Sequence, residues 1–164
     1  MTHPAPIDVS KFQLYPAILG EDDDDTALLK DMAKEALRFL PGLEGAPPAE
    51  RLYLAFGVGG LVAVFLAELT GPLHDRPDTQ IWIVVGDLPE AFIGIACRNP
   101  VMVLQSYCEL MDDWADRVLG RKDMSVAYLI HAEPTPRHAR MLKDRIKLIR
   151  RDIIPEARSN PVWN

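Results

Sequence analysis

The feature that most constrains the fold is an apolar run, Ile81 to Val85, made of four β-branched residues and one aromatic residue. Residues of these types favour a pleated strand over a helix. Alternate side chains along a strand point to opposite faces, and here both sets are apolar. The run therefore predicts an inner strand that other elements cover on both faces. It ends at Gly86-Asp87-Leu88-Pro89, which places a carboxylate at a strand-to-loop junction, a common position for functional groups.

The composition indicates a folded globular chain. Of its 164 residues, 48% are apolar and 26% are charged, as is usual for one domain of this length. The first residues lack a basic stretch followed by an apolar core, so we expect no secretion signal. The longest uncharged run, Leu52 to Ala67, is shorter than the roughly 20 residues needed to cross a bilayer. We expect a cytoplasmic protein with a single domain over residues 1–164 and no membrane association.

The charge is unevenly distributed along the chain. The formal net charge is −6. Residues 1–50 hold ten acidic and four basic side chains, residues 51–136 hold eleven and six, and residues 137–164 hold three and eight. An acidic chain is a poor general binder of nucleic acid, because nucleic acid recruits positive surfaces. The distribution is compatible with a protein partner that has a basic surface.

Four segments have helical patterns. After an extended lead-in over residues 1–25, we expect helices over about 27–40, over about 49–69, from Asn99-Pro100 to Gly120, and from Thr135-Pro136 onward. Asp25 or Thr26 is the expected cap of the first helix, Asn99 of the third and Thr135 of the fourth. The acid run Glu21 to Asp25 lacks the alternating ligands and central glycine of an EF-hand, which argues against a calcium loop.

The segment Gly57-Val-Gly-Gly60 invites comparison with a phosphate-binding loop. No strand is predicted before it and no Lys-Ser or Lys-Thr follows it, so the comparison fails. Glycines inside a helix cost up to about 1 kcal/mol each relative to alanine. We therefore expect these glycines to serve close helix packing or a local kink.

Two further strands are predicted. Ala91 to Ala96 follows the first strand after a short connection, as expected of an antiparallel hairpin. Ser125 to Ile130 is the third candidate. The predicted fold class is α+β, with a small, mainly antiparallel sheet of about three strands packed against about four helices.

The stretch from Trp82 to Phe92, Trp-Ile-Val-Val-Gly-Asp-Leu-Pro-Glu-Ala-Phe, precedes helices that open at Asn99-Pro100 and Thr135-Pro136. This order resembles a group of small uncharacterised bacterial proteins, in which a W-x-V-V-G-D-L-P-x-A-aromatic strand and turn is followed by two helices. The resemblance covers about residues 80–155. It implies a bacterial cytoplasmic protein and no particular activity.

Asp87, His131 and Glu133 each lie just beyond the end of a predicted strand. If these strands are neighbours, a carboxylate and an imidazole converge as a general base and its orienting group. The alternative is that Asp87 bonds to its own turn and that His131 is a loop residue. No sequence signature of a nucleophile is present. We therefore treat these three residues as weak catalytic candidates.

Metal and cofactor sites are not predicted. Cys97 and Cys108 form no metal-binding spacing, and neither do the histidines. We interpret the two cysteines as structural thiols and expect no cofactor.

Four carboxylates, at Glu109, Asp112, Asp113 and Asp116, share one face of the third helix. They repel one another unless positive charge lies nearby. The last helix can supply such charge from its outer face, which holds Arg137, Arg140, Lys143, Lys147, Arg150 and Arg151. The acidic face is thus either a solvated surface answered by the last helix or a surface that captures a basic partner.

The leading functional hypothesis is a non-catalytic binding protein, in its specific form an immunity protein that neutralises a toxin through the four carboxylates. The alternative is an enzyme or small-ligand binder with a pocket at Asp87, His131 and Glu133.

Overall fold

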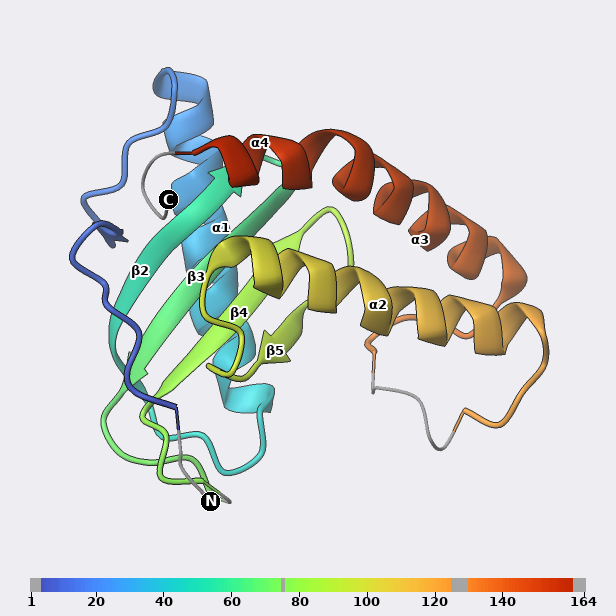
Figure 1. The fold of residues 1–164 in the computed structure, drawn as a ribbon, viewed down its shortest axis with the longest axis horizontal. Coiled ribbons are helices and arrows are strands. Elements are labelled where there is room, and N and C mark those ends of the chain that lie inside the picture. The colour runs from blue at the N-terminus through green and yellow to red at the C-terminus, as the bar shows by residue number, and fades with distance from the viewer. Residues whose placement is uncertain (1–3, 75, 125–129, 161–164) are drawn as a thin grey trace.

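A single antiparallel sheet forms the centre of the structure (Figure 1). The computed structural model describes residues 4–74, 76–124 and 130–160. Within these residues the sheet has five strands, whose spatial order is their order along the chain: β1 (Gln13–Leu14), β2 (Ala49–Val58), β3 (Val62–Leu69), β4 (Gln80–Gly86) and β5 (Ala91–Ile93). The predicted α+β class is confirmed, and the predicted number of strands was too low. Residues 125–129 of the third predicted strand lie outside the described residues.

Helices cover both faces of the sheet. In Figure 1, α1 (Asp23–Phe39) lies behind the sheet and α2 (Pro100–Leu119) lies in front of it. A short 3₁₀ turn (Leu40–Gly42) follows α1. The last helix runs from α3 (Pro136–Leu148) through a π-helical segment (Ile149–Ile153) into α4 (Ile154–Ser159). The described residues thus form three helical bodies, one fewer than predicted.

The predicted caps of α2 and α3 are confirmed. The Asn99 side chain accepts a hydrogen bond from the Met102 N–H, and the Thr135 side chain accepts one from the His138 N–H. Proline stands at the first turn of both helices, where its missing N–H costs nothing. Local sequence signals therefore fix where these two helices begin.

Strand β4 is the inner strand predicted from Ile81 to Val85. It pairs antiparallel with β3 on one side and with β5 on the other, and the five residues of the run are almost completely buried. Trp82 and Val84 belong to the core on the α2 side of the sheet, and the other three belong to the core under α1. The hairpin partner predicted over residues 91–96 is confirmed as β5, although it ends at Ile93.

Residues 49–69 form the β2–β3 hairpin, so the helix predicted there was wrong. The Leu61 N–H donates to the Val58 carbonyl at 3.0 Å, and Gly60 has a φ of +79°, which glycine adopts at no steric cost. A strand buried on both faces has no alternation of polar and apolar residues, and an apolar run of this length therefore looked like a buried helix. The expected packing inside a helix does not occur, but Gly57 of β2 does permit a close approach to a helix, since a Cβ there would lie 2.7 Å from Leu29 Cδ2 of α1.

Asp25 joins the start of α1 to the β2–β3 turn. The N-cap is Asp22 and not the predicted Asp25 or Thr26, because Asp22 Oδ1 accepts the Asp25 N–H at 2.8 Å. The Asp25 carboxylate accepts one hydrogen bond from the Glu21 N–H and one from the Gly59 N–H, each at 2.9 Å. A Cβ at Gly59 would collide with this carboxylate, so glycine permits the close approach.

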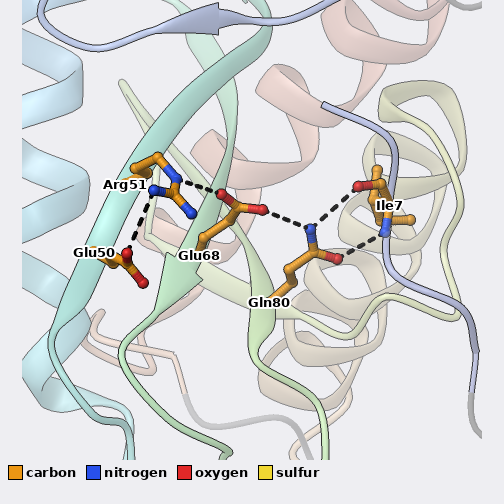
Figure 2. A network of polar contacts seen from close by, with 5 residues as sticks. All are labelled: Ile7, Glu50, Arg51, Glu68 and Gln80. Atoms are coloured by element: carbon orange, nitrogen blue, oxygen red, sulfur yellow. Dashed lines mark hydrogen bonds and ion pairs between the residues drawn. The ribbon is translucent and has the colours of Figure 1, made fainter. Parts of the chain in front are cut away.

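The amino-terminal segment, residues 4–12, packs against the core on the α2 side. Ile7 is 6% exposed and is part of that core, and the Phe12 ring centroid lies 6.1 Å from that of Trp82. Figure 2 shows the Gln80 side-chain amide facing the Ile7 backbone. The Ile7 N–H donates to Gln80 Oε1 at 2.7 Å, and Gln80 Nε2 donates to the Ile7 carbonyl at 3.2 Å.

The same amide belongs to a polar network that crosses three strands (Figure 2). Gln80 Nε2 donates to Glu68 Oε2 at 3.3 Å, and Arg51 Nε donates to Glu68 Oε1 at 2.8 Å. Burial alone raises the pKa of Glu68, but the hydrogen bonds from Arg51 and Gln80 outweigh it and hold the pKa below its ordinary value. A charged Glu68 therefore ties β2, β3 and β4 together.

Candidate functional site

The loop between β4 and β5 holds Asp87 at a fixed place beside the β2–β3 turn. The Asp87 N–H donates to the Leu61 carbonyl at 3.0 Å. Gly86, with φ of +155°, makes this approach possible, because a Cβ there would lie 2.9 Å from the Leu61 carbonyl carbon. At the other end of the loop, the Tyr107 hydroxyl donates to the Pro89 carbonyl at 2.7 Å. The loop is thus anchored to both the sheet and α2.

A surface hollow of about 140 Å³ lies between this loop, α2 and α3. Buried Trp114 and Leu142 supply apolar lining, whereas Met141 is 51% exposed. The full lining consists of Asp87, Leu88, Pro89, Trp114, Ala132, His138, Met141, Leu142 and Arg145. The four residues from α3 have the spacing i, i+3, i+4, i+7, which places them on one face of the helix.

Polar groups border the hollow on two elements. Arg145 Nη2 of α3 lies 2.7 Å from Asp87 Oδ2 of the loop, and both side chains are about half exposed. Exposed ion pairs of this kind contribute about 0–1 kcal/mol. The Asp87–Arg145 pair is therefore weak enough for a ligand's charge to replace one of its members. His138 Nδ1 lies 2.6 Å from the Thr135 hydroxyl.

The structure gives the three weak catalytic candidates separate surroundings. Asp87 pairs with Arg145. His131 Nδ1 contacts the carboxylate of Glu90, whose side chain is only 9% exposed. Glu133 is exposed, and its side chain forms no ion pair or hydrogen bond with the described residues. His131 therefore does meet a carboxylate, but it is one that the sequence did not point to.

His131 and Glu90 do not line the hollow themselves, although Ala132 and Pro89, their neighbours along the chain, do. An imidazole held by a carboxylate through one nitrogen is the arrangement of a general base with its orienting group. The hollow thus has an apolar interior and one exchangeable ion pair, and the histidine held by a carboxylate lies outside its lining.

Lysine and arginine from the last helix reach the predicted acidic surface on α2. Lys143 Nζ lies 3.5 Å from Asp112 Oδ1 and also contacts Asp116, and Arg150 contacts Asp112. The hydrogen bond to Asp116 raises the pKa of Lys143, and the nearby charge of Asp112 adds to the effect. Two of the four carboxylates are therefore engaged across the α2–α3 interface.

The other two carboxylates differ from each other. Asp113 pairs with Arg117 of the same helix at 3.0 Å. Glu109 forms no ion pair within residues 4–74, 76–124 and 130–160. On the outer face of α3, Arg137 and Arg140 likewise have no ion pair with a described residue. Three of the four α2 carboxylates thus form ion pairs within the protein, whereas two arginines on the outer face of α3 form none with a described residue.

The two cysteines are unpaired, and they have different environments. Cys108 is buried in α2, and burial raises the pKa of its thiol to about 11. Cys97 is partly exposed, and its Sγ lies 3.3 Å from the Ser106 hydroxyl. In the part of the chain that the structure describes, no group of three or more His, Cys, Asp or Glu residues is placed to hold a metal ion.

Our sequence-based prediction missed Glu90, His138, Met141 and Arg145. A signal was present for the last three, since their helical spacing defines a second face of α3 beside its buried one. Glu90 carries no such signal, because its contact with His131 depends on how a distant loop packs. No described helix is both long and apolar enough to cross a membrane.

Comparison of the chain with protein-family models, with curated proteins and with solved structures gives no match.

Proposed function

We propose that this chain is a non-catalytic binding protein for another protein, and that the hollow receives an apolar side chain of that partner. The observation that carries the proposal is Met141, which stays half exposed in a hollow lined by buried Trp114 and Leu142. Methionine adapts its shape to a binding partner, and buried aromatic residues are frequent anchors of protein interfaces.

The size of the hollow favours a protein side chain over a small molecule. Sites for cofactors and drug-sized ligands usually measure about 300–1,000 Å³, whereas this hollow measures about 140 Å³. A small molecule of ordinary size would remain mostly in solvent. A single Leu, Met or Phe side chain, presented by a larger surface, matches the space.

The charge around the hollow indicates what else the partner carries. Arg137 and Arg140 flank the lining residues of α3 and have no ion pair with the described residues. A partner carboxylate next to the apolar side chain would meet these cations. A basic partner at the α2 carboxylates, the arrangement expected from the sequence, would first have to displace Lys143 and Arg150. We therefore propose an acidic partner surface around one apolar anchor.

Toxin neutralisation is a specific form of this proposal, supported by the polarised charge of the chain. In that form the partner is an enzyme whose activity falls when the complex forms. Each captured protein should therefore be assayed for loss of activity as well as for binding.

Met141→Asp tests the hollow directly. The substitution puts a carboxylate at a half-exposed position without opening the core. Met102→Asp is the matched control, because Met102 is 39% exposed and lies at the other end of α2 from Trp114. Proteins captured at low salt by the immobilised wild-type chain would be identified by mass spectrometry, purified and titrated against all three chains by calorimetry.

We expect Met141→Asp to weaken the partner's binding by at least about 30-fold, the effect of removing an anchor worth about 2 kcal/mol. Met102→Asp should bind as the wild type does. A partner that binds both substituted chains equally well would show that the hollow is not its docking site.

The His131–Glu90 contact favours a second candidate, acid–base chemistry on a small substrate in the hollow. Small aromatic and aliphatic acids and amines would be titrated while the Trp114 indole resonance is followed by NMR. If one compound shifts this resonance saturably, and Glu90→Gln abolishes its turnover, the second candidate replaces the first. Absence of any saturable shift removes it.

A further inference from the structure

The amino-terminal segment is held through its main chain at Ala5 and at Ile7. The Gln80 amide forms two hydrogen bonds with the backbone of Ile7, one to its N–H and one to its carbonyl. Arg98 Nη1 donates to the Ala5 carbonyl at 2.7 Å and is itself fixed by the Ile95 carbonyl at 2.9 Å. The two groups grip an extended backbone at two points, two residues apart.

A single side chain of this segment is deeply buried among residues 4–9. Ile7 is 6% exposed and enters the core that contains Trp82. Its neighbours Pro4, Ala5, Pro6 and Asp8 are exposed. Such a contact recognises an extended backbone and one branched apolar side chain, and it tolerates change at the flanking positions.

The two prolines suit this mode of binding. Pro4 and Pro6 have no N–H, so they bring no backbone donor that needs a partner. Each proline restricts its own φ, and Pro6 also keeps Ala5 extended. A peptide already restricted in this way loses less conformational entropy when it binds.

We propose that the surface formed by Gln80, Arg98 and the pocket around Ile7 is a binding site for extended peptides of the form Pro-x-Pro followed by a branched apolar residue, and that residues 4–9 are its resident, displaceable ligand. The site lies at the amino-terminal end of α2, whereas the hollow lies near Trp114 towards the other end. It is therefore independent of the proposed docking of a partner at the hollow.

Displaceability follows from how the segment is attached. It belongs to no helix and precedes the two-residue strand β1. Its hydrogen bonds to the sheet are those between the Ile7 backbone and the Gln80 side chain of β4. Segments with one buried anchor open locally without unfolding the whole protein. When the resident segment leaves, Gln80 and Arg98 present the same donors and acceptor to a segment of another chain.

The test uses the full chain and a fluorescent peptide of residues 4–12, Pro-Ala-Pro-Ile-Asp-Val-Ser-Lys-Phe. In the Ile7→Asp chain the resident segment loses its anchor and the site becomes free. We expect this chain to bind the peptide at least about tenfold more tightly than the wild-type chain, because the wild-type site is already occupied by its own segment.

Two controls isolate the site. A peptide carrying Ile7→Asp should not bind, and the Ile7→Asp chain with the added change Gln80→Leu should lose the peptide. Equal binding of the peptide to the wild-type and Ile7→Asp chains, or no saturation below about 1 mM with either, would overturn the proposal.

A second measurement uses only the wild-type chain and does not depend on how the variants fold. Excess unlabelled peptide should displace the resident segment, so the Ile7 amide of the chain should exchange its hydrogen faster. Unchanged exchange of the Ile7 amide at about 1 mM peptide would also overturn the proposal.

Discussion

The Asp25 carboxylate links α1 to the β2–β3 turn, and its removal offers a quantitative test of that link. Asp25→Ala leaves two backbone N–H groups without their acceptor, those of Glu21 and Gly59. The Gly59 bond is partly buried, whereas the Glu21 bond is exposed, so water replaces the acceptor at Glu21 more readily. The cost should therefore come mainly from Gly59.

The expected loss can be estimated group by group. Leaving a partly buried donor without a partner costs about 1–3 kcal/mol. Loss of one carboxylate from the first turn of a helix costs about 0.3–1 kcal/mol through the helix dipole. Together these effects should lower the free energy of unfolding of Asp25→Ala by about 1–4 kcal/mol. Asp25→Asn retains one acceptor oxygen and should fall roughly midway.

Asp24→Ala is the matched control. Asp24 lies in the same first turn, is exposed and forms no hydrogen bond or ion pair within the described ranges. It shares only the dipole effect, so its expected cost is at most about 1 kcal/mol. Urea unfolding of the three variants gives the free energies, and hydrogen exchange of the Gly59 amide shows whether the loss is local to the turn. If Asp24→Ala and Asp25→Ala are equally destabilising, the tertiary link carries no energy and the reasoning is wrong.

Three further predictions concern other parts of the structure. Glu68 has a pKa below its unfolded value of about 4.5, so its stabilising effect is present above the unfolded pKa and is lost as the pH falls through the folded pKa. Glu68→Gln should be destabilising in urea at pH 7, and its cost should shrink as the pH is lowered below 4.5; a cost that stays the same would contradict the lowered pKa. Ellman's reagent at pH 8 should modify Cys97 in the folded protein and Cys108 only after unfolding, because Cys108 is buried and its thiol has a pKa of about 11; equal rates would contradict the described burial. Gly86→Ala should lower the free energy of unfolding by about 2–4 kcal/mol, because its Cβ would strike the main chain at Leu61. Gly42→Ala is the control, since a Cβ there meets no atom within 4 Å, and it should change the thermal midpoint by only a few degrees.

The elements that the sequence predicted well are those specified by local chemistry. The composition of Ile81 to Val85 identified β4 and its two buried faces. Asn99 and Thr135 identified the starts of α2 and α3, because a cap and a following proline act within a few residues. The β2–β3 hairpin was missed because Gly59 and Gly60 lie inside a run that is apolar on both sides. The Gly-Gly pair, which is typical of a hairpin turn, was therefore more informative than the continuous apolar run around it.

The candidate site was predicted only in part. Asp87 was located correctly at the end of β4, since the loop follows directly from the strand. Its partner Arg145 and the Glu90 partner of His131 depend on where α3 and the β5 loop pack, which no local pattern encodes. The α2 carboxylates show the same limit: their spacing and the basic face of the last helix could both be predicted, but which cations make contact, Lys143 and Arg150, depends on where that helix packs.

The order of strands in the sheet has a consequence for synthesis. From β2 to β5 each strand pairs with the one just before it in the chain, so every pairing closes a short loop and can form as soon as its second strand leaves the ribosome. The contact between Ile7 and Gln80 instead spans 73 residues. Residues 4–9 therefore stay without this contact until β4 has been synthesised, and during that interval their backbone is accessible to other proteins.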